Sequence, residues 1–117
     1  MTREDIFAYS MAQYGIAPDY PWRRDPDSAI LRHAHNRKWF ALVMTVSRGA
    51  LGLPGEGRAE LVNLKCDPLL IGSLRHEPGV LPAYHMNKEH WVTVLLDGPF
   101  PAEKLCQLLD LSYDLTR

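Results

Sequence analysis

A dense cluster of polar and aromatic side chains lies immediately before a short apolar run. The cluster supplies phenol, imidazole, amide, amine and indole groups, from Tyr84, His85, Asn87, Lys88, His90 and Trp91. The apolar run 92–96 ends at an Asp-Gly turn signal, a pattern typical of a buried strand. Polar groups at the mouth of a buried strand can bind a small ligand or a protein, or they can make the hydrogen bonds of a turn. The residues alone leave both interpretations open.

The histidines lack the spacing of a metal site. His85 and His90 are five residues apart, which places them on opposite faces of a strand or about 140° apart on a helix. Neither lies in an H-E-x-x-H motif. His33 and His35 could share one strand face, but no third ligand accompanies them, so we expect both on the surface. We therefore expect no metal and no cofactor.

Nucleophilic catalysis has no recognisable motif in this chain. There is no G-x-S-x-G sequence, and Cys66 and Cys106 lie far apart in apolar or capping surroundings, as expected of buried thiols. The glycine-rich stretch 48–58 matches neither phosphate-binding glycine motif, and no helix is expected after it. We expect a protein that is not an enzyme.

Basic residues are concentrated in one part of a chain whose net charge is −1. Residues 21–50 hold six arginines and lysines against two aspartates, and two tryptophans are interleaved with them. Such side chains contact phosphates in nucleic-acid complexes. The candidate nucleic-acid contacts are Arg23, Arg24, Arg32, Arg37, Lys38, Arg48, Arg58 and Lys88. The whole chain nevertheless lacks the basic excess of a committed nucleic-acid binder.

Length and composition indicate one ordinary globular domain over residues 1–117, with 46% hydrophobic and 23% charged residues. No apolar stretch is long enough to cross a membrane, and the N-terminus lacks the apolar region of a signal peptide. These features favour a cytoplasmic protein that does not bind membranes. The sequence does not fix the oligomeric state, and we favour a monomer.

Local signals predict the elements that must position these residues. Helices are expected over 2–15, from Asp67-Pro68 onward, and after Pro101; strands are expected at 28–33, 39–46, 60–65 and 92–96. The order α-β-β-β-α-β-α has no regular βα alternation. An α+β fold is therefore expected, with helices packed on one face of an antiparallel sheet.

Several short motifs resemble the MmcQ/YjbR family of small bacterial proteins. They are L-K-C-D-P at 64–68, P-A-Y-H-M-N-K-E-H-W at 82–91, L-D-G at 96–98 and S-Y at 112–113, together with W-F-A-L at 39–42 and Y-P-W at 20–22. The resemblance implies a CyaY-like fold. It also implies binding of double-stranded DNA through a "double wing" of hairpins, here the segments 32–38 and 48–58. Frataxin-type iron binding needs an acidic first helix, and this one offers only Glu4 and Asp5.

Two functional hypotheses follow. The first is a non-enzymatic DNA-binding protein of low sequence specificity, in which the basic residues contact phosphates. The alternative is a small-ligand or protein-binding module that uses the cluster 84–91.

Overall fold

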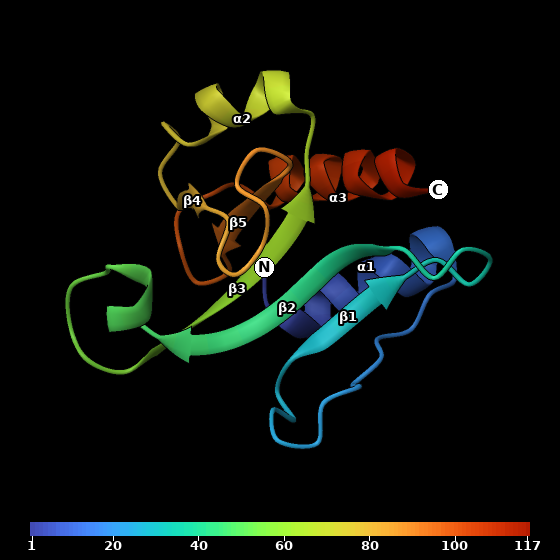
Figure 1. The fold of residues 1–117 in the computed structure, drawn as a ribbon, viewed down its shortest axis with the longest axis horizontal. Helices are drawn as coiled ribbons and strands as arrows, with labels where there is room; N and C mark the ends of the chain where they lie inside the picture. The colour runs from blue at the N-terminus through green and yellow to red at the C-terminus, as the bar shows by residue number, and fades with distance from the viewer.

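The chain folds around one five-stranded antiparallel sheet, in a computed structural model that describes residues 1–117 (Figure 1). The strands are β1 (Ala29–Arg32), β2 (Trp39–Ser47), β3 (Arg58–Lys65), β4 (Val80–Pro82) and β5 (Trp91–Leu95), arranged in the order β1-β2-β3-β5-β4. The helices are α1 (Arg3–Tyr14), α2 (Pro68–Leu74) and α3 (Ala102–Thr116), with a 3₁₀ turn, η1 (Gly49–Leu51), between β2 and β3. None of these helices combines the length and the apolar character that crossing a bilayer requires.

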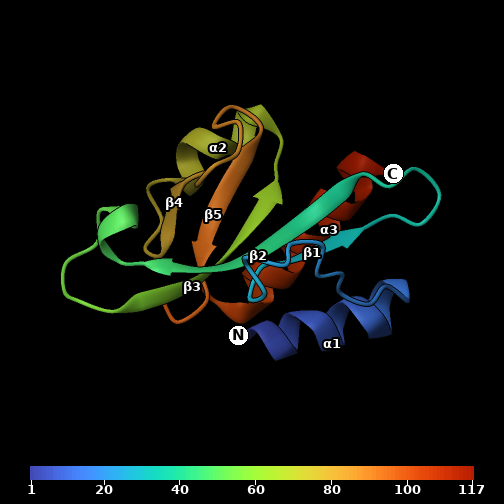
Figure 2. The ribbon, with the colours of Figure 1, turned by 60° about the horizontal axis from the view of Figure 1, so that its bottom comes forward.

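The helices cover one face of the sheet and leave the other face without a helix (Figures 1 and 2). Ile6 of α1, Ile71 of α2 and Leu109 of α3 belong to a single buried cluster with side chains from the strands. The opposite face, which we call the open face, carries Trp39, Leu42, Met44, Asn63 and Thr93. The predicted α+β class, with helices packed on one side of an antiparallel sheet, is confirmed.

Local capping signals define where the first two helices begin. The Thr2 hydroxyl accepts a hydrogen bond from Asp5 N at 3.2 Å, and Thr2 N donates to the Asp5 carboxylate at 2.9 Å. These bonds lower the pKa of the Asp5 carboxyl. The carboxylate of Asp67 accepts from Leu69 N at 2.9 Å and caps α2, whose first residue is Pro68. Both predicted helix starts are confirmed.

A bulge in β2 decides which large side chains reach the core. Leu31 pairs with Ala41 but Arg32 pairs with Trp39, so Phe40 is the extra residue. Phe40 and Ala41 therefore both join the buried cluster on the helical side, while Trp39 lies on the open face. A hydrogen bond from the helical side stabilises the bulge, because the Ser112 hydroxyl of α3 donates to Phe40 O at 2.6 Å.

One predicted element was incomplete. The segment around the cluster 84–91 forms a hairpin of two strands, β4 and β5, and not one strand, so the order is α-β-β-β-α-β-β-α. The added strand has three residues and lies at the edge of the sheet, where Pro82 ends it. A strand this short shows no alternation that sequence inspection can detect.

The expectation that His33 lies on the surface was wrong. Its side chain is 1% exposed, and its Nε2 lies 2.8 Å from Thr116 Oγ1 and 3.1 Å from Tyr113 O. The end of α3 supplies these polar partners, which satisfy the ring inside the protein. Burial lowers the pKa of His33, and the contact with Tyr113 O opposes that shift only in part.

Candidate binding groove on the open face

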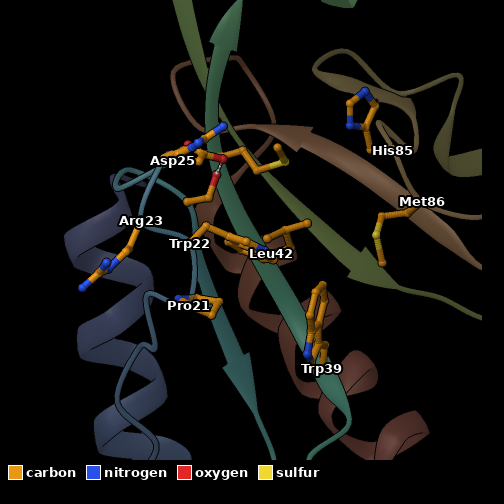
Figure 3. A pocket seen from close by; sticks show the side chains of 11 residues that line it. Pro21, Trp22, Arg23, Asp25, Trp39, Leu42, His85 and Met86 are labelled. Atoms are coloured by element: carbon orange, nitrogen blue, oxygen red, sulfur yellow. Dashed lines mark hydrogen bonds between the residues drawn. The ribbon is translucent and has the colours of Figure 1, made fainter.

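A hollow of about 560 Å³ lies on the open face, between the segment 21–28, strand β2 and the loop 83–90 (Figure 3). Trp22 and Trp39 form a right-angled corner in it, with ring centroids 5.7 Å apart and planes at 81°. Leu42 lies between the walls, and His85 and Met86 stand on the side opposite Trp22. Met44 of β2 also lines the hollow. The hollow thus offers aromatic ring surface together with a mostly apolar floor.

The wall that carries Trp22 is tied to the edge of the sheet. Asp19 makes a backbone bridge to Ile30 of β1, with both N–H···O bonds at 2.9 Å, and its carboxylate pairs with Arg32. Farther along, Asp25 N donates to Trp22 O at 3.3 Å, and the Asp25 carboxylate accepts from the buried Ser28 hydroxyl. A proline-rich segment is thereby fixed as a turn that presents an indole.

The opposite wall, formed by the loop 83–90, is held by two buried polar side chains of the sheet, Asn63 and Thr93, which we call the Asn63–Thr93 latch. Asn63 of β3 and Thr93 of β5 are both fully buried, and the Thr93 hydroxyl donates to the Asn63 side-chain oxygen. Between them they bind both backbone groups of Tyr84, whose N–H donates to Thr93 Oγ1 at 2.9 Å and whose carbonyl accepts from Asn63 Nδ2 at 3.1 Å. His85 follows with a positive φ of 59° and stacks on the Tyr84 ring at 4.0 Å.

A second, smaller hollow of about 390 Å³ continues from the first. Both are lined by Trp39 and Met86, so the two hollows adjoin, and the second extends to Thr116 at the end of α3. The second hollow adds Trp91 and two lysines, Lys38 and Lys65. We use "the groove" for these two hollows.

The groove has a cationic rim. Arg23 and Arg24 line the first hollow, as Lys38 and Lys65 line the second, and none of the four forms an ion pair within the chain. In Figure 3 the Arg23 side chain extends away from the tryptophans, at the edge of the hollow. Asp25 is the one acidic residue in the lining, and its carboxylate is bound by Ser28. The arrangement suits an anion that also carries planar groups.

The structure separates the basic residues that the sequence singled out. Arg32 pairs with Asp19, while Arg48 Nε donates to Pro54 O at 2.8 Å and Arg58 Nη2 to Thr45 O at 2.7 Å. Arg37 and Lys38 are exposed in the turn between β1 and β2. That turn and the connection 48–58 lie at opposite ends of β2 (Figure 1). Arg23, Arg24 and Lys38 are therefore the predicted contacts that the groove brings together.

The predicted cluster 84–91 divides among several sites. His85 and Trp91 line the groove, whereas Lys88 lies beside two other hollows, near α2 and near η1. Asn87 makes the hydrogen bonds of a turn, since its Oδ1 accepts from Glu89 N at 2.8 Å and its carbonyl accepts from Trp91 N at 2.9 Å. His90 is exposed, and its carbonyl accepts from Cys66 N at 2.8 Å. Asn87 thus makes the hydrogen bonds of a turn, as one hypothesis held, whereas His85 and Trp91 lie where the hypothesis of a binding site would place them.

Sequence inspection missed Lys65, Leu42, Met44 and Met86. Lys65 pairs with Trp91 in the register between β3 and β5, and this pairing brings the two toward the same hollow. Strand register depends on contacts between distant segments, so no short motif signals it. The interleaving of Trp22 and Trp39 with basic residues was the one available signal.

Several tyrosine and cysteine side chains elsewhere in the fold have a raised pKa. Burial and hydrogen bonds to Asp110 raise the pKa of Tyr9 to about 12 and also raise the pKa of Tyr14. Burial also raises the pKa of the thiols of Cys66 and Cys106. The structure contains no group of three or more His, Cys, Asp or Glu side chains placed to hold a metal ion. The chemistry that the groove offers is stacking, apolar contact and cationic attraction.

Comparisons with known proteins agree with this description of the fold. The model of the YjbR family matches residues 11–115. The uncharacterised protein YyaQ of Bacillus subtilis is 44% identical over 117 residues, which are 100% of this chain and 99% of YyaQ. A crystal structure of a Pseudomonas syringae protein superposes with a TM-score of 0.98 at 46% identity, with full coverage of both chains. A Deinococcus radiodurans protein with the domain DUF419 gives a TM-score of 0.74 at 30% identity, over 97% of this chain and 77% of its own.

Proposed function

The chain belongs to the YjbR family, and we propose that it is a non-enzymatic, cytoplasmic protein that binds DNA with low sequence specificity through the groove. Its two cysteines are free thiols, as is usual in a reducing compartment. Ring faces can stack on any base, and cations can contact the phosphate of any nucleotide. These two kinds of contact favour binding without sequence preference.

The observation that carries this proposal is the combination of aromatic rings with cations that form no ion pair, in two adjoining hollows. Cations that already bind carboxylates must lose that partner before they contact phosphate, whereas Arg23, Arg24, Lys38 and Lys65 have no such partner. Arg32 is paired to Asp19, so its contribution to phosphate binding is expected to be smaller. The proposal therefore depends mainly on Arg23, Arg24 and Lys38, which were predicted from the sequence, and on Lys65, which the structure adds.

A salt titration of DNA binding tests the proposal. Fluorescence anisotropy of a labelled oligonucleotide should show an affinity that falls steeply with salt. The double variant Arg23→Gln/Arg24→Gln should reduce the magnitude of the log–log salt slope by roughly 1.4 to 1.8, the effect of two lost phosphate contacts. A matched control, Arg75→Gln/Lys104→Gln, removes the same charge at the end of α2 and from α3, outside the lining of both hollows, and should leave the slope almost unchanged.

The proposal fails if no DNA binds at low salt. It also fails if the two double variants change the slope equally, because net charge alone would then explain the binding.

A second candidate function, the binding of a small ligand, is favoured by the size of the first hollow. Its volume of about 560 Å³ lies within the range of small-molecule sites, which is about 300–1,000 Å³. His85 and Met86 form one wall of it, so the predicted cluster 84–91 would contribute to such a site. Native mass spectrometry of the purified chain tests this candidate, since a tightly held ligand adds a discrete mass. A mass equal to that of the bare chain would count against it.

A further inference from the structure

The two hollows of the groove repeat one arrangement. The first combines the corner of Trp22 and Trp39 with Arg23 and Arg24. The second combines Trp39 and Trp91 with two lysines. Each hollow thus pairs ring surface with two cations, which is the pairing that one nucleotide presents as a base and a phosphate. A polymer of nucleotides fits this repetition better than a single nucleotide does.

The ring surfaces line concave hollows: Trp39 and Trp91 belong to strands of the sheet, and Trp22 belongs to the wall formed by the segment 21–28. In a duplex the faces of the bases are stacked on one another, and only their edges are accessible in the grooves. An indole in a hollow therefore has nothing to stack on in an intact duplex. In a single strand every base has a free face, and stacking on aromatic side chains is the usual mode of recognition.

The projecting segments do not favour a duplex either. The turn at 33–38 and the connection 48–58 lie at the two ends of β2 along the longest axis of the molecule (Figure 1). Arg37 stands in the first of these, outside the lining of the groove, and Arg58 of the second is bound to Thr45 O. Lys38, at the end of the first segment, lines the groove together with Arg23, Arg24 and Lys65, and none of these four forms an ion pair.

The wall formed by the loop 83–90 gives the groove a defined width. Met86 lines both hollows, and His85 is held beside the first by its stacking on Tyr84. The Asn63–Thr93 latch fixes the backbone of Tyr84, so the wall is set by buried hydrogen bonds in the sheet. A strand of bases would then lie between this wall and Trp22.

We propose that the groove binds single-stranded DNA, with one base in the corner of Trp22 and Trp39, the next against Trp91, and the phosphates facing Arg23, Arg24, Lys38 and Lys65. The inference rests on the proposed DNA-binding function and specifies its substrate class. Base contacts through ring faces are sequence-tolerant, which agrees with the low specificity proposed above.

Competition between three probes tests the inference at one low salt concentration: an oligothymidylate of about ten nucleotides, a duplex of similar length, and thymidine monophosphate. We expect the oligothymidylate to bind at least about tenfold more tightly than either of the others. Replacing Trp39 by leucine should weaken it by about 5- to 100-fold, because one stacked base is lost. Lys38→Gln/Lys65→Gln, which leaves the rings in place, should weaken binding and lower the salt slope.

Each contrary result has its own meaning. A duplex that binds as tightly as the single strand, with Trp39→Leu unaffected, would overturn the single-strand inference and leave the DNA-binding proposal standing. Monophosphate that binds as tightly as the oligomer would overturn it in favour of a single-nucleotide site. Binding of no probe would overturn both proposals. Near-ultraviolet circular dichroism of Trp39→Leu checks that the fold is retained. The variant Lys38→Gln/Lys65→Gln tests binding in the groove independently, because it leaves the aromatic rings unchanged.

Discussion

The hydroxyl of Thr93 donates to the side-chain oxygen of Asn63 across β5 and β3, and both side chains are fully buried. On a sheet face without helices, buried polar side chains need partners, because an unsatisfied group costs about 1–3 kcal/mol. The partners here are each other and the backbone of Tyr84. The latch thus links the interior of the sheet to the wall of the groove.

Replacing Thr93 by valine should therefore destabilise the protein by about 1–3 kcal/mol, since the near-isosteric change leaves Asn63 Oδ1 and Tyr84 N without their partner. Urea unfolding measures the loss, and hydrogen exchange of the Tyr84 amide should accelerate as the wall loosens. Ser73→Ala removes an exposed hydroxyl from α2 and should change stability by less than about 0.5 kcal/mol. Unchanged Tyr84 exchange in Thr93→Val would show that the latch does not hold the wall.

Gly79 and Gly72 should respond to alanine in opposite directions. A Cβ at Gly79 would lie 3.1 Å from Pro99 Cδ and 3.2 Å from Phe100 N, at a φ of +86°. We expect Gly79→Ala to cost more than about 1 kcal/mol. Gly72 is helical with open space around it, so Gly72→Ala should stabilise by up to about 1 kcal/mol. Thermal unfolding of both variants measures these changes in stability. Equal changes in unfolding temperature would contradict the described packing of Gly79 beside β4.

Stability should depend on pH through His33. Its pKa is lowered mainly by burial, so below the ordinary value of 6.5 the unfolded chain binds a proton that the folded chain does not. The stability is fully present above that value and is lost as the pH falls through the folded pKa. His33→Asn should flatten this dependence in urea unfolding, whereas His35→Asn, at an exposed position, should retain it. Equal slopes in the two variants would exclude His33 as the cause.

At high pH the stability of the protein should depend mainly on the two tyrosines that bind Asp110. Tyr9 and Tyr14 donate to its carboxylate at 3.0 and 2.5 Å, and burial with these bonds raises both phenol pKa values above 10. Stability is then present below pH 10 and is lost above it, because the unfolded phenols ionise first. Tyr14→Phe should reduce this loss and should cost about 1.5–3 kcal/mol at neutral pH. Tyr84→Phe is the control, and an identical alkaline profile in Tyr14→Phe would refute the assignment.

The features that could be predicted from sequence are those set by neighbouring residues. The capping box of Thr2 and Asp5 spans three positions, and Asp67 with Pro68 marks a helix start by itself. Such capping signals act between neighbouring residues, so they could be recognised in the sequence. They predicted where the helices begin and, with the strand patterns, the order of the elements. The family resemblance agreed with them.

The features that could not be predicted depend on contacts between distant segments. The bulge at Phe40 sends Trp39 to the open face, and the register of β3 with β5 sets Lys65 opposite Trp91. His33 is buried because α3 ends beside it, some eighty positions later in the chain. Two of these three placements build the groove, which explains why the site was harder to predict than the fold.

The three tryptophans provide a direct test of whether nucleic acid occupies the groove, because the chain contains no others. A ¹H–¹⁵N titration with oligothymidylate follows the three indole N–H signals at once. If nucleic acid occupies the groove, all three signals, from Trp22, Trp39 and Trp91, should shift together with the backbone signals of residues 85–86. Shifts confined to the turn 33–38 and the connection 48–58, with the indole signals unmoved, would contradict it.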